Sequence, residues 1–112
     1  MANQYPDNQR VADHSSPYNL SELAIEKFKS GDYPEAIDAF NKALALDENW
    51  HSYQGLGWAL HLTRQYQQAI EAFNKSLALH EDWQSYQGLG WALSNSNQFQ
   101  AAIEAFNQSL AL

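Results

Sequence analysis

The four histidines are the side chains of this sequence most suited to binding a metal ion, and their spacing decides whether they can do so together. His51 and His61 are ten residues apart, which is about 15 Å along an α-helix and too far to share one ion. The other two, His14 and His80, lie in polar segments without helical periodicity. The chain has no cysteine and no His-x-x-x-His pair to complete a zinc site. We therefore expect no metal site and no cofactor.

Two glycine pairs, Gly55-Leu56-Gly57 and Gly88-Leu89-Gly90, are the motifs closest to a phosphate-binding loop. Each lacks the third glycine of such a loop and neither follows a strand pattern, so the nucleotide-binding interpretation fails. Small residues within a helical stripe instead favour close packing of two helices, which must offset about 1 kcal/mol of helix propensity per glycine. No nucleophile lies beside a base and no carboxylate pair marks a pocket. We therefore predict that the chain is not an enzyme.

A stripe of aromatic and amide side chains is the strongest sign of a binding surface. Trp58 and Trp91 both stand within a Gly-Trp-Ala-Leu sequence, and the residues that share their helix face recur at the spacing i, i+3, i+7 and i+10. The stripe comprises Tyr18, Ser21, Ile25, Phe28 and Lys29, then His51, Gln54, Trp58, His61 and Leu62, then Gln84, Gln87, Trp91, Ser94 and Asn95. We interpret it as a partner-binding surface. A structural ladder of stacked tryptophans on neighbouring helices is the alternative.

The elements that must position this stripe come from one segment that occurs twice. Residues 50–79 read WHSYQGLGWALHLTRQYQQAIEAFNKSLAL, and residues 83–112 read WQSYQGLGWALSNSNQFQAAIEAFNQSLAL. The two copies differ at eight of 30 positions, and a weaker copy of their second half lies at residues 36–46, upstream by the same interval. Self-similarity at a constant interval of this length, the step from Trp50 to Trp83, predicts a stack of helical hairpins.

Capping residues predict where the first helix of each hairpin begins. Ser16, Asn49 and Asp82 are favoured N-cap residues, and they recur at the same interval as the repeated segment. Pro17, which follows Ser16, is favoured at the first position of a helix. The caps and the repeat are carried by different residues, and they predict the same boundaries.

The turn inside each hairpin is also predicted by residue type. Gly31 suits the left-handed backbone that ends a helix, and Asp32 with Glu35 forms an Asp-x-x-Glu pattern that caps the next helix. Asn97 suits the left-handed conformation better than Arg64 does at the corresponding position. We therefore expect the turn at Arg64 to be the most strained of the three.

These residues resemble the tetratricopeptide repeat family over residues 17–112, in both helices of three consecutive units. The family's packing positions are occupied by Leu23, Leu56 and Leu89; Ala24, Gly57 and Gly90; Ala36, Ala69 and Ala102; Phe40, Phe73 and Phe106; and Ala43, Ser76 and Ser109. Leu20, Tyr53 and Tyr86 replace the family's usual tryptophan, and Glu48 and Glu81 replace its usual proline. The resemblance implies an all-α solenoid of three antiparallel hairpins in a right-handed superhelix. We expect a polar tail at 1–15 and repeats at 16–49, 50–82 and 83–112.

The resemblance also implies a function, because the stripe then lines a concave groove in which the family binds peptides. The family's clamp for a C-terminal carboxylate is not implied, since Ser21, Ile25, Gly55, Gln84 and Gly88 occupy its places. Three differences between the copies, His51/Gln84, His61/Ser94 and Leu62/Asn95, fall on groove positions. Specialisation of the groove and drift of exposed residues both account for them. A self-associating scaffold and an accessory segment of a larger enzyme are the alternative functions.

Charge and composition narrow the class of partner. The 13 acidic and 6 basic residues give a net charge of −7, which argues against nucleic acid because such binding depends on neutralising phosphates. No apolar run marks a signal peptide or a membrane span. We therefore expect a cytoplasmic protein whose partner is another protein or a peptide, with no membrane partner.

The last repeat has a second feature, an apolar edge at its final helix. Glu104 is its one charged residue, so little charge opposes association. In stacked arrays the terminal helix needs a polar cap, and Ile103, Leu110 and Leu112 are expected to form an uncovered edge. A self-complementary apolar patch predicts a two-fold homodimer through this helix.

Overall fold

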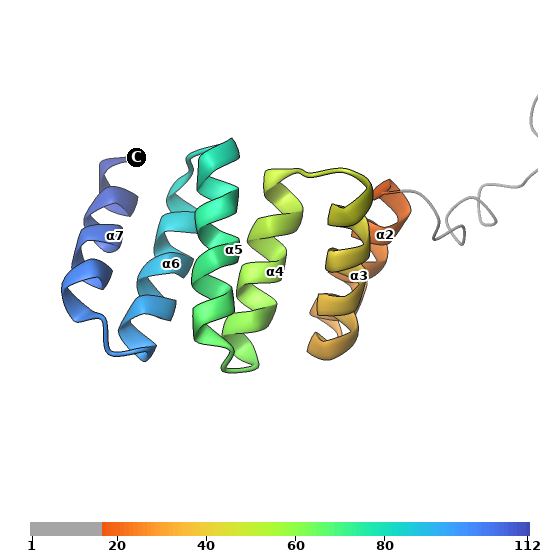
Figure 1. Ribbon diagram of the computed structural model, residues 1–112, viewed down its shortest axis with the longest axis horizontal. Helices are drawn as coiled ribbons and strands as arrows, with labels where there is room; N and C mark the ends of the chain where they lie inside the picture. The colour runs from red at the N-terminus through yellow and green to blue at the C-terminus, as the bar shows by residue number, and fades with distance from the viewer. Residues whose placement is uncertain (1–16) are drawn as a thin grey trace, which may run out of the picture.

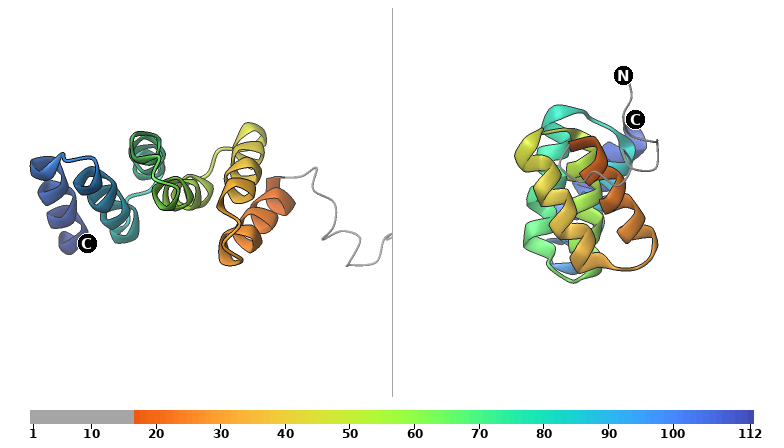
Figure 2. Two further views of the ribbon diagram at one scale, coloured as in Figure 1. Left: turned by 90° about the horizontal axis from the view of Figure 1, so that it is seen from below. Right: turned by 90° about the vertical axis from the view of Figure 1, so that its right-hand side faces the viewer.

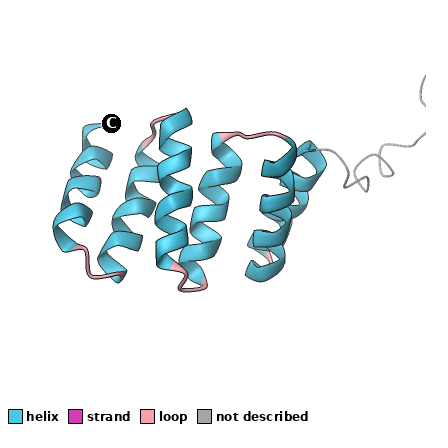
Figure 3. Ribbon diagram, viewed as in Figure 1, coloured by secondary structure: helices cyan, strands magenta, loops and turns pink. Residues whose placement is uncertain are grey.

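The computed structural model describes residues 17–112, and the side chains of residues 19–112. This part of the chain contains six α-helices and no strand (Figure 3). The helices are α2 (Pro17–Lys29), α3 (Tyr33–Leu46), α4 (Trp50–Leu62), α5 (Tyr66–Leu79), α6 (Trp83–Asn95) and α7 (Phe99–Ala111). The all-α prediction is confirmed, whereas the predicted tail at 1–15 and the predicted cap at Ser16 lie outside the described residues.

The helices form three hairpins that stack in chain order. α2 packs on α3, α4 on α5 and α6 on α7, and successive hairpins are joined by α3 against α4 and α5 against α6 (Figures 1 and 2). α7 forms one end of the stack and α2 with α3 the other (Figure 1). The predicted solenoid of helical hairpins is therefore observed.

One phenylalanine in each second helix organises the core between neighbouring hairpins. Phe73 in α5 is fully buried, and it lies between the backbones of α4 and α6. A Cβ atom added at Gly57 would lie 2.8 Å from the Phe73 ring, and one added at Gly88 would lie 2.4 Å from it. Side chains at these two positions would collide with the ring, which confirms that the glycine pairs serve helix packing.

Two of the predicted N-caps hold the starts of their helices. The side chain of Asn49 accepts a hydrogen bond from the backbone N–H of Ser52 at 2.8 Å, and that of Asp82 accepts one from Ser85 at 2.7 Å. Both cap residues have the extended backbone that a cap requires. The sequence therefore predicted the starts of α4 and α6 correctly.

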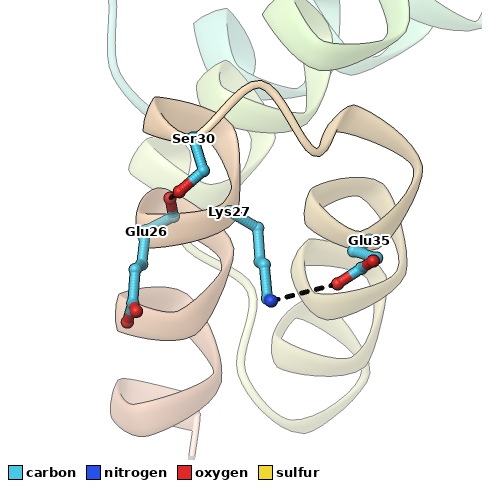
Figure 4. Close-up of polar contacts among 4 residues, drawn as sticks. All are labelled: Glu26, Lys27, Ser30 and Glu35. Atoms are coloured by element: carbon cyan, nitrogen blue, oxygen red, sulfur yellow. Dashed lines mark hydrogen bonds and ion pairs between the residues drawn. The ribbon is translucent and has the colours of Figure 1, made fainter.

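The predicted cap at the start of α3 is wrong. Asp32 has a φ of −86° and a ψ of 67° and makes no side-chain cap bond, because this backbone geometry lies outside the extended region that caps use. Glu35 instead forms an ion pair with Lys27 of α2 at 3.1 Å (Figure 4). The acidic residue at this turn thus joins the two helices of the first hairpin. It does not close a capping box.

The three turns inside the hairpins use the left-handed backbone as predicted. The φ angles are 83° at Gly31, 64° at Arg64 and 66° at Asn97. Arg64 is the residue type that fits this conformation worst, because its Cβ meets the following carbonyl and it lacks the short polar side chain of asparagine. Backbone strain is therefore concentrated in the turn between α4 and α5.

Candidate functional site

The first helices of the hairpins lie side by side and form a continuous face. α4 contacts both α2 and α6, whereas the second helices α3, α5 and α7 do not pack on one another to the same extent. An array whose first helices are closer together than its second helices curves toward the first-helix side. We call the stripe positions of α2, α4 and α6 the first-helix face.

Polar side chains join the first helices to one another. Ser21 Oγ lies 3.1 Å from Ser52 Oγ, which links α2 to α4. Gln54 Nε2 donates to Ser85 Oγ at 2.8 Å and to Asp82 Oδ2 at 3.1 Å, which links α4 to α6. Gln54, predicted as a partner contact, is thus engaged inside the array. Gln87, its equivalent one period later, is exposed.

The two tryptophans of the stripe are placed differently. Trp58 is half-buried against the core, with its ring 5.5 Å from that of Phe73 at 83°. Trp91 is 49% exposed, although its ring lies 5.4 Å from that of Phe106 at 79°. Trp58, predicted as part of the partner-binding surface, therefore packs partly on the core. The approach of the phenylalanine is the same at Gly57 and Gly90, so it does not account for the difference. Trp58 also contacts the ring of His61 at 5.8 Å.

The alternative interpretation, a ladder of stacked tryptophans, does not describe this arrangement. Within the described residues, each indole meets the phenylalanine of its own hairpin edge-on, and the two indoles make no ring contact with each other. Edge-to-face pairs of this kind fix the orientation of an indole ring. The ring of Trp91 is thus held in place while half of its surface stays open to solvent.

His61 is the titratable group of the first-helix face whose surroundings change its chemistry. Its ring lies 5.8 Å from that of Trp58 and 5.4 Å from that of Tyr66, and its Nδ1 atom is buried without a hydrogen-bond partner. Burial lowers the pKa of the imidazole below its ordinary value of 6.5, because a cation is poorly solvated among aromatic rings. His61 therefore offers an uncharged ring at neutral pH.

The other predicted stripe residues divide by exposure. Ile25, Lys29, His51, Leu62, Gln84 and Asn95 are exposed, Phe28 and Ser94 are half-buried, and the side chain of Tyr18 lies outside the described residues. The His51 ring stacks on the Trp50 ring, with centroids 3.6 Å apart, and the His80 ring lies 4.4 Å from the same indole. His51 therefore has a partner beside the stripe that the periodic spacing did not predict.

A pair of tyrosine–glutamate hydrogen bonds was not predicted. Tyr53 Oη donates to Glu48 Oε1, and Tyr86 Oη donates to Glu81 Oε1 at 2.7 Å. The bond to Glu48, with burial as the smaller cause, raises the pKa of Tyr53. In each pair the tyrosine replaces the family's tryptophan and the glutamate its proline, and the two lie five residues apart. The shared spacing of five residues is the feature of the sequence from which these two hydrogen bonds could have been predicted.

The structure also holds a cleft that no pattern in the sequence predicts. It has a volume of about 540 Å³ and lies between α3 and α5, away from the first-helix face. Its lining comprises Ile37, Asn41, Leu44, Ala45, Tyr53, Leu56, Leu60, Gln65, Gln68, Glu71, Ala72 and Lys75. The cleft exists because the second helices are spread apart while the first helices touch. It is a second surface on which a ligand could dock.

The predicted apolar edge of the last repeat is exposed in this structure. Ile103, Leu110 and Leu112 are all more than half exposed, at 53%, 85% and 62%. They lie at the end of the stack, where α7 has a neighbouring helix on one side only (Figure 1). The two-fold homodimer expected from this edge stays a prediction.

The described helices offer neither a cluster of metal ligands nor a membrane span. Among residues 17–112, no group of three histidine, cysteine, aspartate or glutamate side chains is placed to hold a metal ion. In the same part of the chain, none of the helices has the length and apolar character needed to cross a bilayer.

Comparison with solved structures finds the same fold. The crystal structure of MamA is 26% identical, superposes with a TM-score of 0.83, and matches over 90% of this chain and 60% of that one. A MamA structure from Desulfovibrio magneticus RS-1 is also 26% identical, with a TM-score of 0.83, and it matches over 87% of this chain and 56% of that one. This chain therefore spans about 60% of the MamA chains' length.

In a third comparison the two chains match over almost their whole lengths. The structure is the second TPR of Spaghetti (RPAP3) bound to the HSP90 peptide SRMEEVD, with 18% identity, a TM-score of 0.84, and 93% and 98% of the two chains covered. At this identity the likeness concerns the fold alone. No curated protein sequence matches the chain.

Family models give the same assignment from the sequence. The model described as "Tetratricopeptide repeat" matches residues 20–82, which is more than half of the chain, and a second model with that description matches residues 84–112. Together they cover the helices from α2 to α7. The chain belongs to the tetratricopeptide repeat family.

Proposed function

We propose that this chain is a protein-interaction module that binds an extended or helical segment of another protein on its concave first-helix face. The observation that carries the proposal is the fixed but exposed ring of Trp91. Its ring is held edge-on by Phe106 and is still 49% exposed. A large aromatic ring that is already fixed in place binds a partner at low entropic cost.

The side chains around Trp91 indicate the chemistry of the partner. α6 (Trp83–Asn95) has no charged residue, and Gln84, Gln87 and Asn95 present exposed amides beside the indole. Amides both donate and accept hydrogen bonds, which suits the backbone of an extended segment. Ile25 and Leu62 add exposed apolar surface on α2 and α4. A partner segment with apolar side chains and few charges fits this surface best.

An acidic peptide tail fits less well. The RPAP3 domain with this fold was solved with the acidic peptide SRMEEVD, but here no basic side chain stands at the places of the family's carboxylate clamp. The net charge of −7 also opposes the approach of an acidic ligand. The proposal therefore concerns a neutral or basic apolar segment.

The proposal is tested by selecting a binding peptide from a random library against the immobilised full chain. The affinity of that peptide is then measured for the wild type, Trp91→Ala and Leu79→Ala. Trp91 is the better target than Trp58, because Trp58 packs on the core. Leu79 is a matched control, since it is an exposed apolar side chain, 52% exposed, outside the first-helix face.

We expect Trp91→Ala to weaken binding about tenfold or more, as replacing an aromatic anchor does, and Leu79→Ala to leave it unchanged. Circular dichroism of each variant checks that the helices persist. Unaltered affinity in folded Trp91→Ala would remove the support for this face.

A further inference from the structure

The hairpins α4–α5 and α6–α7 have the same backbone at their inner turns. Gln65 has a φ of −94° and a ψ of 67°, and Gln98 has a φ of −98° and a ψ of 68°. The backbone N–H of Gln65 donates to the carbonyl oxygen of Leu60 at 2.8 Å, and that of Gln98 donates to the carbonyl oxygen of Leu93 at 2.8 Å. Residues that lie one repeat apart beside these two turns therefore occupy equivalent places.

In the hairpin α4–α5, the ring of His61 contacts an aromatic side chain on each helix. Its centroid lies 5.8 Å from that of Trp58 on α4 and 5.4 Å from that of Tyr66 on α5. Trp58 and Tyr66 are both half-buried, and the Nδ1 atom of His61 is buried as well. The place beside these two rings is thus occupied by a flat ring of the chain itself.

In the hairpin α6–α7, the two aromatic side chains are present and the flat ring is missing. Trp91 and Phe99 occupy the positions of Trp58 and Tyr66, and Ser94 stands at the position of His61. The serine side chain ends one atom beyond Cβ, so it cannot cover two rings as an imidazole does. Trp91 is 49% exposed and Phe99 is 58% exposed. The place that His61 occupies in the second repeat is therefore open to solvent in the third.

The surroundings of this open place favour a ring without charge. α6 has no charged residue, and Glu104 is the one charged residue of α7. In the equivalent place of the second repeat, burial lowers the pKa of His61, so the ring that fills it is uncharged at neutral pH. Aromatic rings also pair favourably with a further flat ring that meets them edge-on or offset.

We propose that Trp91, Ser94 and Phe99 form a subsite that receives one aromatic or histidine side chain of the partner. The inserted ring takes the place that His61 takes one repeat earlier, and it contacts the indole of Trp91 and the ring of Phe99. The inference rests on the proposed function of the first-helix face and names the side chain that the partner must carry. Because His61 already fills the equivalent place in the second repeat, the partner inserts its ring at the third.

The test combines substitutions in the selected peptide with substitutions in the full chain. Each aromatic or histidine residue of the peptide is replaced by alanine in turn, and the affinities are measured for the wild type, Ser94→His and Phe99→Ala. Ser94→His supplies the subsite with the ring that the second repeat has, and Phe99→Ala removes one of its two aromatic contacts. Gln108→His is the matched control, because it adds the same side chain at an exposed position of α7 outside the first-helix face.

One ring of the peptide is expected to contribute about tenfold or more to its affinity for the wild type. Its replacement is expected to cost clearly less in Ser94→His and in Phe99→Ala, because residues in contact are coupled. Gln108→His is expected to bind like the wild type, and circular dichroism checks that each variant is folded.

A selected peptide without such a ring would overturn the proposal. So would a ring whose replacement costs as much in either variant as in the wild type. The result for Trp91→Ala separates this inference from the proposed function. If Trp91→Ala weakens binding while the ring shows no coupling to Ser94 or Phe99, the first-helix face stands and the subsite alone is wrong.

Discussion

At the scale of single residues, the environment of a side chain decides its role more than its type does. His61 and His51 lie on the same helix, yet only His61 has a ring nitrogen buried without a partner. Gln54 and Gln87 are one period apart, yet Gln54 bonds the next hairpin and Gln87 is exposed. Equivalent positions therefore have different roles according to whether a further hairpin follows.

His61 makes the stability of the fold depend on pH. Its pKa is lower in the folded chain than the ordinary 6.5 of the unfolded chain, so the unfolded state binds the proton more readily. The stability is fully present above pH 6.5 and is lost as the pH falls through the lowered pKa. We expect the melting temperature of the wild type to fall more between about pH 7.5 and 5.5 than that of His61→Ser.

The third repeat has a serine, Ser94, at the position equivalent to His61. His61→Ser is therefore a conservative control. His51 and His80 are present in both proteins, so any contribution from them cancels in the comparison. The same dependence on pH in wild type and variant would show that the burial of His61 has no effect on stability.

At the scale of the helices, mutation of a predicted cap residue tests whether that residue stabilises the start of its helix. Asn49→Ala should lower the free energy of unfolding by about 1 kcal/mol, the usual cost of an N-cap, because it removes the bond to the N–H of Ser52. Asp32→Ala should cost about 0.5 kcal/mol or less, because Asp32 makes no cap bond. Urea unfolding of both variants measures the difference, and an equal cost would contradict these cap assignments.

The sequence predicted the helices well because each depends on local signals. The constant interval between the copies, the N-cap types at Asn49 and Asp82 and the left-handed residues in the turns are visible without knowledge of the neighbours. Asp32 failed as a cap because its backbone angles, a φ of −86° and a ψ of 67°, are close to those of Gln65 and Gln98 at the same place in the other two hairpins. The hairpin turn has this geometry with aspartate or glutamine at the position, so a capping residue type there does not produce a cap.

The candidate site was predicted less completely than the helices. Helical spacing grouped Trp58 with Trp91, and both indoles meet a phenylalanine edge-on. Trp58 also contacts the ring of His61, whereas the equivalent residue beside Trp91 is Ser94, and spacing alone does not encode this difference. The cleft between α3 and α5 depends on how far the second helices spread apart. The curvature of the array sets this spread, and no single repeat determines it.

At the scale of the whole molecule, stability depends on position in the stack. Phe73→Ala should cost about 3–5 kcal/mol, as loss of a fully buried ring does, because Phe73 is enclosed by α4 and α6. Phe106→Ala should cost clearly less, since Phe106 is half-buried at the end of the array. Thermal unfolding of the two variants compares them. A Phe106→Ala variant as unstable as Phe73→Ala would mean that α7 is covered in solution.

The central claim is that partners bind on the first-helix face, and nuclear magnetic resonance tests it most directly. The selected peptide is titrated into the isotope-labelled full chain, and the backbone amide and indole signals are followed. The account predicts that shifts cluster on α6, at the indole N–H of Trp91 and the amide of Gln87, and extend to Leu62 on α4. Shifts confined to the cleft between α3 and α5, at Ile37, Asn41 and Lys75, would contradict it.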